Sequence, residues 1–279
     1  MNISAKIIAD SVSETGKRIT TLQVQFPKAI LAEFLTHRVF SRNFSSSRAI
    51  PVNKVAQLDY FEPVYWGKNK EGMQAKLEEI ENKEEAEKIW NDAIKYCRNS
   101  SLKLAELGLH KQWSNRIMDW FIMVNGIVTS TEFDNFFTLR IHADAQPEIN
   151  LLASKMKEAM DNSTPKLLHN YEWHLPYVLE EEKDYYKNHS DHYILPKISA
   201  ARCCRVSYLK HDGQKPSIED DLIRFNKLAG STPKHYSPLE HQATPDEIIL
   251  GEYSYPRFHG NFVGWIQFRK LDERGLVSG

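Results

Sequence analysis

Alternating apolar and polar positions near the N-terminus predict a strand that leads into a short helix. Leu22, Val24 and Phe26 alternate with polar residues, which is typical of a half-buried strand. Pro27 then opens the apolar run K-A-I-L-A-E-F-L, where its fixed φ suits the first turn of a helix. We expect the segment from Thr36 to Arg48 to leave the end of this helix as a loop.

The middle of the chain is largely helical in its residue pattern. From Gly72 to Leu107 the composition turns to Glu, Lys, Ala and Leu with helical spacing, which predicts two helices or one helix broken near Asn99-Ser100-Ser101. The charges there fit a solvated face. Residues 51 to 70, rich in Pro, Tyr, Phe and Trp, predict an ordered loop over the site. The apolar run from Met118 to Val128 predicts a buried helix or strand.

Two later segments show a clear amphipathic helical stripe. The first begins at Asp144, and its apolar stripe consists of Ile149, Leu152, Ala153, Met156 and Met160. The second follows Ser217, which we expect to cap a helix with Asp220 in the capping-box position. The buried stripe of that helix is Ile218, Leu222, Phe225 and Leu228, with Gly230 at its end.

Composition and charge exclude several classes of protein. The chain has 279 residues, so it can bury a substantial core, and its net charge of −1 provides no general field for nucleic acid. Apolar runs are too short to span a membrane, and the first residues do not resemble a signal peptide, so we expect a cytoplasmic protein. Three cysteines without a C-x-x-C pair predict neither a disulfide framework nor a zinc site. The spacing of the histidines at 169, 174, 189 and 192 does not fit a metal site on one element, and we expect them to be surface or loop residues.

The segment from Thr36 to Arg48 carries the most conspicuous chemistry. It reads T-H-R-V-F-S-R-N-F-S-S-S-R and contains no acidic residue. Hydroxyls, exposed backbone N–H groups and guanidinium forks are the donors that a phosphate monoester needs. A solvated, Ser-rich cap with scattered arginines would give the same composition, and composition alone does not separate the two interpretations.

A second polar feature interrupts an apolar stretch. Asn135 lies among the aromatic residues of Phe133 to Leu139, and Arg140 ends the run. Polar side chains on such an element must be paired or point into a polar cleft. The alternative is an Asn that bonds the backbone in the core and an Arg whose head reaches solvent.

The polar segment resembles the signature of the flavin-dependent thymidylate synthases, which is Arg-His-Arg, seven residues, Ser. Here His37-Arg38 is followed by seven residues and Ser46, while Thr36 replaces the first Arg. Ser41, Asn43 and Arg48 also fall where that family carries Ser, Asn and Arg.

Two more blocks are similar to the same family. D-N-F-F-T-L-R followed by A-Q-P-E-I matches the block in which Asn contacts flavin and Arg reaches the nucleotide, which correspond to Asn135 and Arg140. Arg116 resembles the earlier nucleotide-phosphate Arg, whereas Thr129 and Thr131 stand where family members have Asn and Arg. S-A-A-R-C-C-R-V-S-Y and K-H-Y-S-P-L-E-H resemble segments that normally stand near the family's N-terminus.

The order of these blocks predicts a circular permutation. We expect one domain over residues 1–279, in which residues 198–271 correspond to the family's N-terminal portion and pack beside the strand Ile19 to Phe26. Asn261 to Leu271 resembles the helix before the His-Arg segment, and Arg269 or Lys270 is a candidate to replace the charge missing at Thr36. The resemblance implies an α+β fold with a mixed or antiparallel sheet packed against long helices.

The resemblance also implies an activity and a division of roles. The family methylates C5 of dUMP with methylenetetrahydrofolate, using FAD that NADPH reduces, and it forms a homotetramer with shared flavin sites. The flavin residues implied are His37, Arg38, Asn43, Asn135, His235 and Ser237. The nucleotide residues implied are Ser46, Ser47, Arg48, Arg116 and Arg140, of which Ser46 and Arg140 are also the catalytic candidates.

Two other functions remain open at this point. Cys203 or Cys204 could serve as the nucleophile of a folate-only synthase or a pyrimidine hydroxymethylase, although buried structural thiols fit their setting better. A non-catalytic relative that binds a nucleotide or RNA is the third interpretation, motivated by Thr36, Thr129 and Thr131. The residues do not distinguish thymidylate from another C5-modified pyrimidine nucleotide, and they do not locate the folate site.

Overall fold

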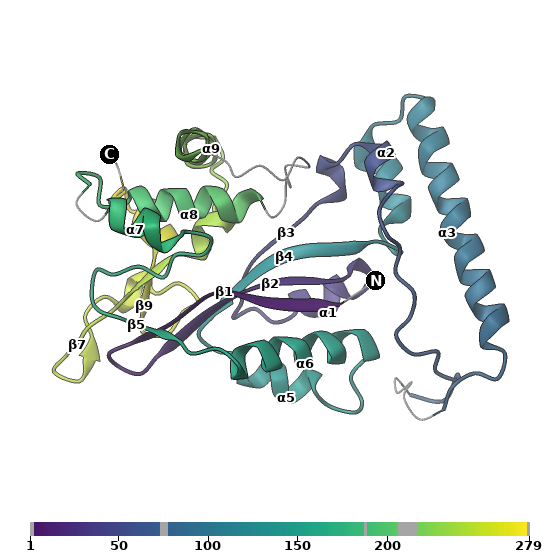
Figure 1. Ribbon diagram of the computed structural model, residues 1–279, viewed down its shortest axis with the longest axis horizontal. Helices are drawn as coiled ribbons and strands as arrows, with labels where there is room; N and C mark the ends of the chain where they lie inside the picture. The colour runs from purple at the N-terminus through teal and green to yellow at the C-terminus, as the bar shows by residue number, and fades with distance from the viewer. Residues whose placement is uncertain (1–2, 73–77, 187–188, 206–216, 278–279) are drawn as a thin grey trace.

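The computed structural model describes residues 3–72, 78–186, 189–205 and 217–277, and a five-stranded mixed sheet lies at its centre (Figure 1). The strand order is β3-β4-β2-β1-β5. Strands β1 (Ser4–Ser13), β2 (Arg18–Pro27), β4 (Met123–Ser130) and β3 (Ser41–Phe44) pair antiparallel. Only β5 (Lys166–Leu168), among the described strands of this sheet, runs parallel to its neighbour. The expected α+β class with a mixed sheet is confirmed.

Strand β2 is the central strand that the alternation near the N-terminus predicts. Leu22, Val24 and Phe26 are at most 1% exposed and share one core cluster with residues of α6. The chain then continues through a 3-10 turn, η1 (Lys28–Ile30), into α1 (Leu31–Leu35), so the predicted short helix is present.

The segment after α1 differs from expectation because part of it is a strand. Residues Ser41–Phe44 form β3, which pairs with β4 at the edge of the sheet, and η2 (Ser47–Ala49) follows it. The sequence S-R-N-F lacks the apolar alternation of a strand, and its conformation comes from pairing with a partner more than 80 residues away.

Helices α5 (Asp134–Arg140) and α6 (Pro147–Asp161) lie together beside one face of the sheet (Figure 1). The predicted stripe of α6 is confirmed, since Ile149, Leu152, Ala153 and Met156 are buried against β1 and β2. The helix begins at Pro147 rather than at Asp144, with the proline at the first helical position, where its missing N–H costs no hydrogen bond.

The long helix α3 (Lys83–Glu106) forms a flank beside the sheet (Figure 1). It is continuous through Asn99-Ser100-Ser101, so neither a break nor a second helix exists there, and residues 73–77 of the same expected helical region lie outside the described residues. Ser101 is fully buried, and α3 packs against η3 (Asn115–Met118); this tertiary packing outweighs the weak helix formers. Short helices α2 (Val52–Val55) and α4 (Lys111–Ser114) complete this flank.

The C-terminal third packs on the other end of the sheet. Its helices are α7 (Glu180–Tyr186), α8 (Ile194–Arg205), α9 (Ile218–Ala229) and α10 (Phe268–Glu273). Its remaining elements are η4 (Ser237–Glu240), β6 (Ala243–Pro245), β7 (Ile248–Ile249), β8 (Glu252–Tyr253), η5 (Pro256–Phe258) and β9 (Trp265–Gln267). Ala243 and Trp265 pack against Ile19 of β2, which is the contact expected of the displaced block.

Two local expectations for this region have different outcomes. The cap at Ser217 is confirmed, because its side chain accepts from the backbone N–H of Asp220. The helix expected over Asn261 to Leu271 begins only at Phe268, since Trp265–Gln267 pairs with β6 instead. Val206 to Tyr208, the end of the third family-like block, lie outside the described residues. In the described part of the chain, none of the helices combines the length and apolar character needed to cross a bilayer.

Candidate functional site

Strand β3 divides the His-Arg segment into a polar group before it and a polar group after it. Phe44 pairs with Gly126 of β4, and its ring covers the space where a side chain at position 126 would stand. The same ring meets Phe26 and Phe34 edge-on, with centroid distances of 5.5 and 5.6 Å. This aromatic anchor holds both polar groups at fixed positions on the sheet edge.

The first group is centred on His37, which is buried against the rings of Phe40 and Phe136. Arg140, at the end of α5, donates from Nε to Nε2 of His37 at 2.9 Å. Burial, followed by the charges of Arg140 and Arg42, lowers the pKa of His37 to about 4. The imidazole is therefore neutral at pH 7, with Nε2 accepting the hydrogen bond and Nδ1 carrying the proton.

Thr36 replaces the first Arg of the family signature, and a cation from elsewhere in the chain lies beside it. Nη2 of Arg140 lies 3.4 Å from Oγ1 of Thr36. Arg269, one of the two expected replacements, instead pairs with Glu240, and that carboxylate also interacts with the charge of Arg42. The positive charge that contacts Thr36 is therefore the guanidinium of Arg140.

The C-terminal segment is bonded to the sheet next to this group. Nε2 of Gln267 donates to Oγ of Ser41 at 3.2 Å and to Oδ1 of Asn261 at 2.9 Å. Thr131 accepts the backbone N–H of Val263 at 3.0 Å. Thr131, where family members have Arg, thus serves as a contact between the two parts of the chain.

A buried chain of hydrogen bonds crosses the sheet from β1 to the C-terminal segment. Ser11 and Thr21 bond the two ring nitrogens of His174 at 2.9 and 2.7 Å, and Thr21 also bonds Thr129 at 2.7 Å. Thr129 in turn bonds Nδ1 of His241 at 2.8 Å. Burial lowers the pKa of each imidazole to about 3. Of the two settings expected for His174, surface or loop, the surface is wrong: the residue lies outside the named helices and strands but is buried, and hydroxyl partners on both nitrogens allow a neutral imidazole in the core.

The thiols of Cys203 and Cys204 in α8 are buried, as expected of structural cysteines. Cys203 is fully buried, and its carbonyl oxygen accepts from Nδ2 of Asn43 at 2.9 Å. Burial raises the pKa of the Cys203 thiol far above its usual range, and it also raises the pKa of Cys204. A nucleophilic cysteine needs an accessible thiolate, so this geometry argues against Cys203 as the nucleophile.

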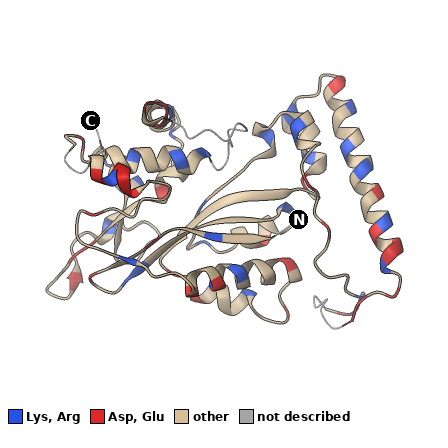
Figure 2. Cartoon of the chain, viewed as in Figure 1, with Lys and Arg blue, Asp and Glu red and all other residues tan. Residues whose placement is uncertain are grey.

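The second polar group lies beyond β3 and is strongly cationic. Nζ of Lys28 donates to Oγ of Ser47 at 3.2 Å and pairs with Asp119 at 2.6 Å. Arg116 lies 3.8 Å from the other carboxylate oxygen of Asp119. Arg48 is close enough for its charge to act on Lys28. Figure 2 shows Lys and Arg on the chain around α2, next to this group.

The side-chain amide of Asn115 holds the turn that contains Ser46 and Ser47. Nδ2 of Asn115, a fully buried residue, donates to the carbonyl oxygens of Ser47 and Ile50 at 2.7 and 2.9 Å. The hydroxyl of Ser46 accepts from Nε of Arg48 at 3.4 Å. Within the described part of the chain, no His, Asp or Glu bonds this hydroxyl, so the geometry fits a positioning group better than an activated nucleophile.

The remaining residues expected at the site lie at the surface. Asn135, His235 and Ser237 are exposed, and the η4 turn that begins at Ser237 packs against β3 and α8. The alternative of an Asn that bonds the backbone in the core is therefore wrong, since Asn135 is exposed on α5, while its contact with flavin stays a prediction. Arg38 is also exposed and makes no hydrogen bond or ion pair within the described residues.

The structure also regroups the expected arginines. Arg140 bonds His37 of the first group, whereas Arg116 lies beside Asp119 and Arg48 bonds Ser46 in the second group. Sequence reasoning missed Lys28, although it directly follows Pro27 and begins the run into α1. Nothing in its local pattern shows that it faces Asp119, more than 90 residues later.

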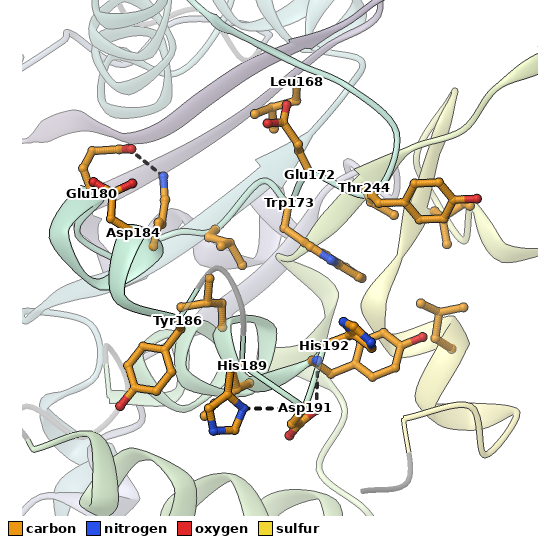
Figure 3. A pocket seen from close by; sticks show the side chains of 18 of the residues that line it. Leu168, Glu172, Trp173, Glu180, Asp184, Tyr186, His189, Asp191, His192 and Thr244 are labelled. Atoms are coloured by element: carbon orange, nitrogen blue, oxygen red, sulfur yellow. Dashed lines mark hydrogen bonds and ion pairs between the residues drawn. The ribbon is translucent and has the colours of Figure 1, made fainter.

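A separate cavity of about 870 Å³ lies between the C-terminal helices and the segment that follows α6 (Figure 3). Trp173 lines it and meets Tyr193 edge-on at 6.1 Å, while Lys183 donates to Glu180 at 2.7 Å on its charged side. Its lining contains no residue of the Thr36 to Arg48 segment and none of the expected site residues. The cavity is therefore distinct from the candidate site.

The chain matches one family model and is similar to several solved structures. The family model described as thymidylate synthase complementing protein matches residues 13–166. No curated protein sequence matches the chain. Two crystal structures of the UMP/dUMP methylase PolB from Streptomyces cacaoi, one bound with 5-Br dUMP and one with 5-Br UMP, are 14% identical to it with a TM-score of 0.49. The alignments cover 57% of this chain and 90% or 88% of those chains.

The family match covers more than half of the chain and includes the His-Arg segment, Arg116 and Arg140. It contains strands β2, β3 and β4, next to which both polar groups lie. The chain therefore belongs to the thymidylate synthase complementing protein family, the flavin-dependent thymidylate synthases, whose chemistry is C5 methylation of a uridine nucleotide.

Proposed function

We propose that this protein methylates C5 of dUMP to give dTMP, with methylenetetrahydrofolate as the carbon donor and FAD, reduced by NADPH, as the redox cofactor. The observation that carries the proposal is the placement of the serine turn Ser46–Ser47 among Lys28, Arg48 and Arg116. Family membership supplies the reaction class, and this cluster supplies a binding place for the phosphate of a nucleotide.

The group around His37 fits a flavin dinucleotide by the chemistry of its donors. Arg38, Arg42 and Arg140 place three guanidinium groups near His37, and Arg38 is exposed and without a bond inside the described structure. A pyrophosphate bridge requires such cationic donors. When bound, FAD would supply the hydride that turns the transferred one-carbon group into a methyl group.

The residues of the chain supply placement and charge. Arg48 and Arg116 would hold the nucleotide phosphate, with Ser46 and Ser47 donating hydroxyl hydrogen bonds. Arg140 lies in the other group and, from there, would polarise the uracil carbonyl as negative charge develops on the ring. Because His37 is neutral, the Nε of Arg140 is held in place by the imidazole rather than repelled by it.

The permuted order and the oligomeric state are parts of the same proposal. We propose that residues 198–271 correspond to the family's N-terminal portion, which is supported by the packing of Ala243 and Trp265 on Ile19 and by η4 against β3. We further propose a homotetramer in which the His37 group of one subunit and the Ser47 group of another complete one site.

The test is flavin retention and nucleotide binding in paired variants. The purified protein should absorb at about 450 nm, the band of oxidised flavin. His37→Ala with Arg38→Ala should lose FAD, whereas Arg48→Ala should keep FAD and bind dUMP at least about tenfold more weakly. Full FAD occupancy in the double variant, or loss of both ligands in Arg48→Ala, would contradict the assignment.

A further inference from the structure

Lys28 lies at the junction between β2 and η1 and extends to the serine turn. Its side chain is 15% exposed, and that of its partner Asp119 is 16% exposed. Nζ lies 2.6 Å from Asp119 and 3.2 Å from Oγ of Ser47. An ammonium group has three donors, so one donor of Lys28 remains for a third partner on the side of the turn.

The charges around this ammonium group do not balance. Burial lowers the pKa of Lys28, and the charges of Arg116 and Arg48 act in the same direction, while Asp119 opposes them. Lys28 and the three groups whose charges act on it, Arg116, Arg48 and Asp119, therefore have a summed charge of +2. A phosphate monoester carries a charge of about −1.5 to −2 at pH 7, so one such group would neutralise the cluster.

We propose that Lys28 is a phosphate-binding residue of the nucleotide site and that Asp119 sets the charge of that site so that it matches one phosphate monoester. The inference rests on the proposed function and extends it to two residues outside the family signature described above. Lys28 donates to the phosphate while Ser47 and Asp119 hold its ammonium group in place. Arg116 lies 3.8 Å from the same carboxylate.

The location of Lys28 supports a role in binding rather than in folding alone. It is anchored on a central strand and on η1, whose Ile30 is buried in the core, so its side chain approaches the turn from a rigid base. Asn115 fixes the same turn by donating to the backbone carbonyl oxygens of Ser47 and Ile50. A rigid ammonium group reduces the entropy lost when the phosphate binds.

The test is calorimetric titration of the flavin-bound protein with dUMP, deoxyuridine and ribose 5-phosphate. Lys28→Met should bind dUMP and ribose 5-phosphate about 10- to 100-fold more weakly, which is the range for losing a hydrogen bond to a charged group. Its affinity for deoxyuridine should equal that of the wild type. Lys54→Met is the matched control, because Lys54 is an exposed lysine of α2 with no ion pair in the described structure, and it should stay within twofold.

Asp119→Asn tests the charge balance by removing the negative charge instead of a positive one. It keeps an oxygen that accepts from Lys28 and raises the local charge to +3, so it should bind dUMP at least as tightly as the wild type. Weaker binding of dUMP by Asp119→Asn would overturn the charge argument even if Lys28→Met failed to fold. Lys28→Arg should recover most of the affinity that Lys28→Met loses.

The outcomes separate this inference from the proposed function. If the wild type binds dUMP and Lys28→Met binds it equally well, the role of Lys28 is wrong and the function stands. If Lys28→Met loses deoxyuridine and dUMP in equal measure, the residue is structural and the inference fails. If the wild type binds ribose 5-phosphate through Lys28 but not dUMP, the inference stands and the proposed substrate is wrong.

Discussion

Replacing Gly126 with Ala should force apart the two strands that carry the His-Arg segment. A Cβ at position 126 would lie 2.0 Å from Cδ1 and 2.2 Å from Cε1 of Phe44. The ring cannot simply rotate away, because Phe26 and Phe34 pack edge-on against it. Either the ring or strand β3 must therefore move.

The size of the effect follows from the contact that must open. Carbon atoms in contact need about 3.5–4.0 Å, so the ring must shift by roughly 1.5–2 Å. Overpacking of this kind costs about 1–3 kcal/mol, and the smaller backbone entropy of unfolded Ala offsets about 0.4–1 kcal/mol of it. We expect a net loss of about 1–2 kcal/mol, or a melting temperature about 2–8 °C lower.

Urea unfolding of four proteins measures this effect: the wild type, Gly126→Ala, Phe44→Ala and the double variant. In the Phe44→Ala background the added methyl group meets no ring, so Gly126→Ala should cost little there. An equal loss in both backgrounds would refute the proposed clash, and so would an unchanged unfolding midpoint in Gly126→Ala. Because β3 leads into the serine turn, dUMP affinity should fall together with stability in the single variant.

Three further outcomes are expected. Changing Cys97, Cys203 and Cys204 to Ser should leave most of the turnover, and complete loss of turnover with nucleotide still bound would favour a cysteine nucleophile. Since burial lowers the pKa of His174 from 6.5 to about 3, its contribution to stability is complete above pH 6.5 and disappears as the pH falls toward 3. Urea unfolding between pH 7 and 4 should show that decline, with a smaller slope in His174→Gln. Ser217→Ala should reduce the free energy of unfolding by about 1 kcal/mol through loss of the α9 cap, and an unchanged value would contradict the importance of that bond.

Features encoded by neighbouring residues could be predicted from the sequence. The alternation of Leu22, Val24 and Phe26 identifies β2, and the 3.6-residue repeat from Ile149 to Met156 identifies α6. The cap at Ser217 is a local hydrogen bond between residues three apart. In each case residues only two to seven positions apart determine which face is buried or which group accepts the hydrogen bond.

Features that depend on distant partners could not be predicted in this way. Strand β3 has no apolar alternation, and its pairing with β4 is what makes it a strand. His174 gives no sign of burial in its own segment, because the hydroxyls that satisfy its ring come from β1 and β2. Asn99-Ser100-Ser101 reads as a helix break, yet packing against η3 keeps α3 continuous.

The candidate site shows the same division. The resemblance to the family's signature points to His37, Arg38 and Ser46, because these motif residues lie within one short segment. Arg140 is 103 positions from His37 and Asp119 is 91 from Lys28, and only the folded sheet brings these pairs to hydrogen-bond distance. Spacing in the sequence determines contacts only between residues a few positions apart. The charge around a site instead depends on side chains from several distant strands and turns, and only the fold brings these together.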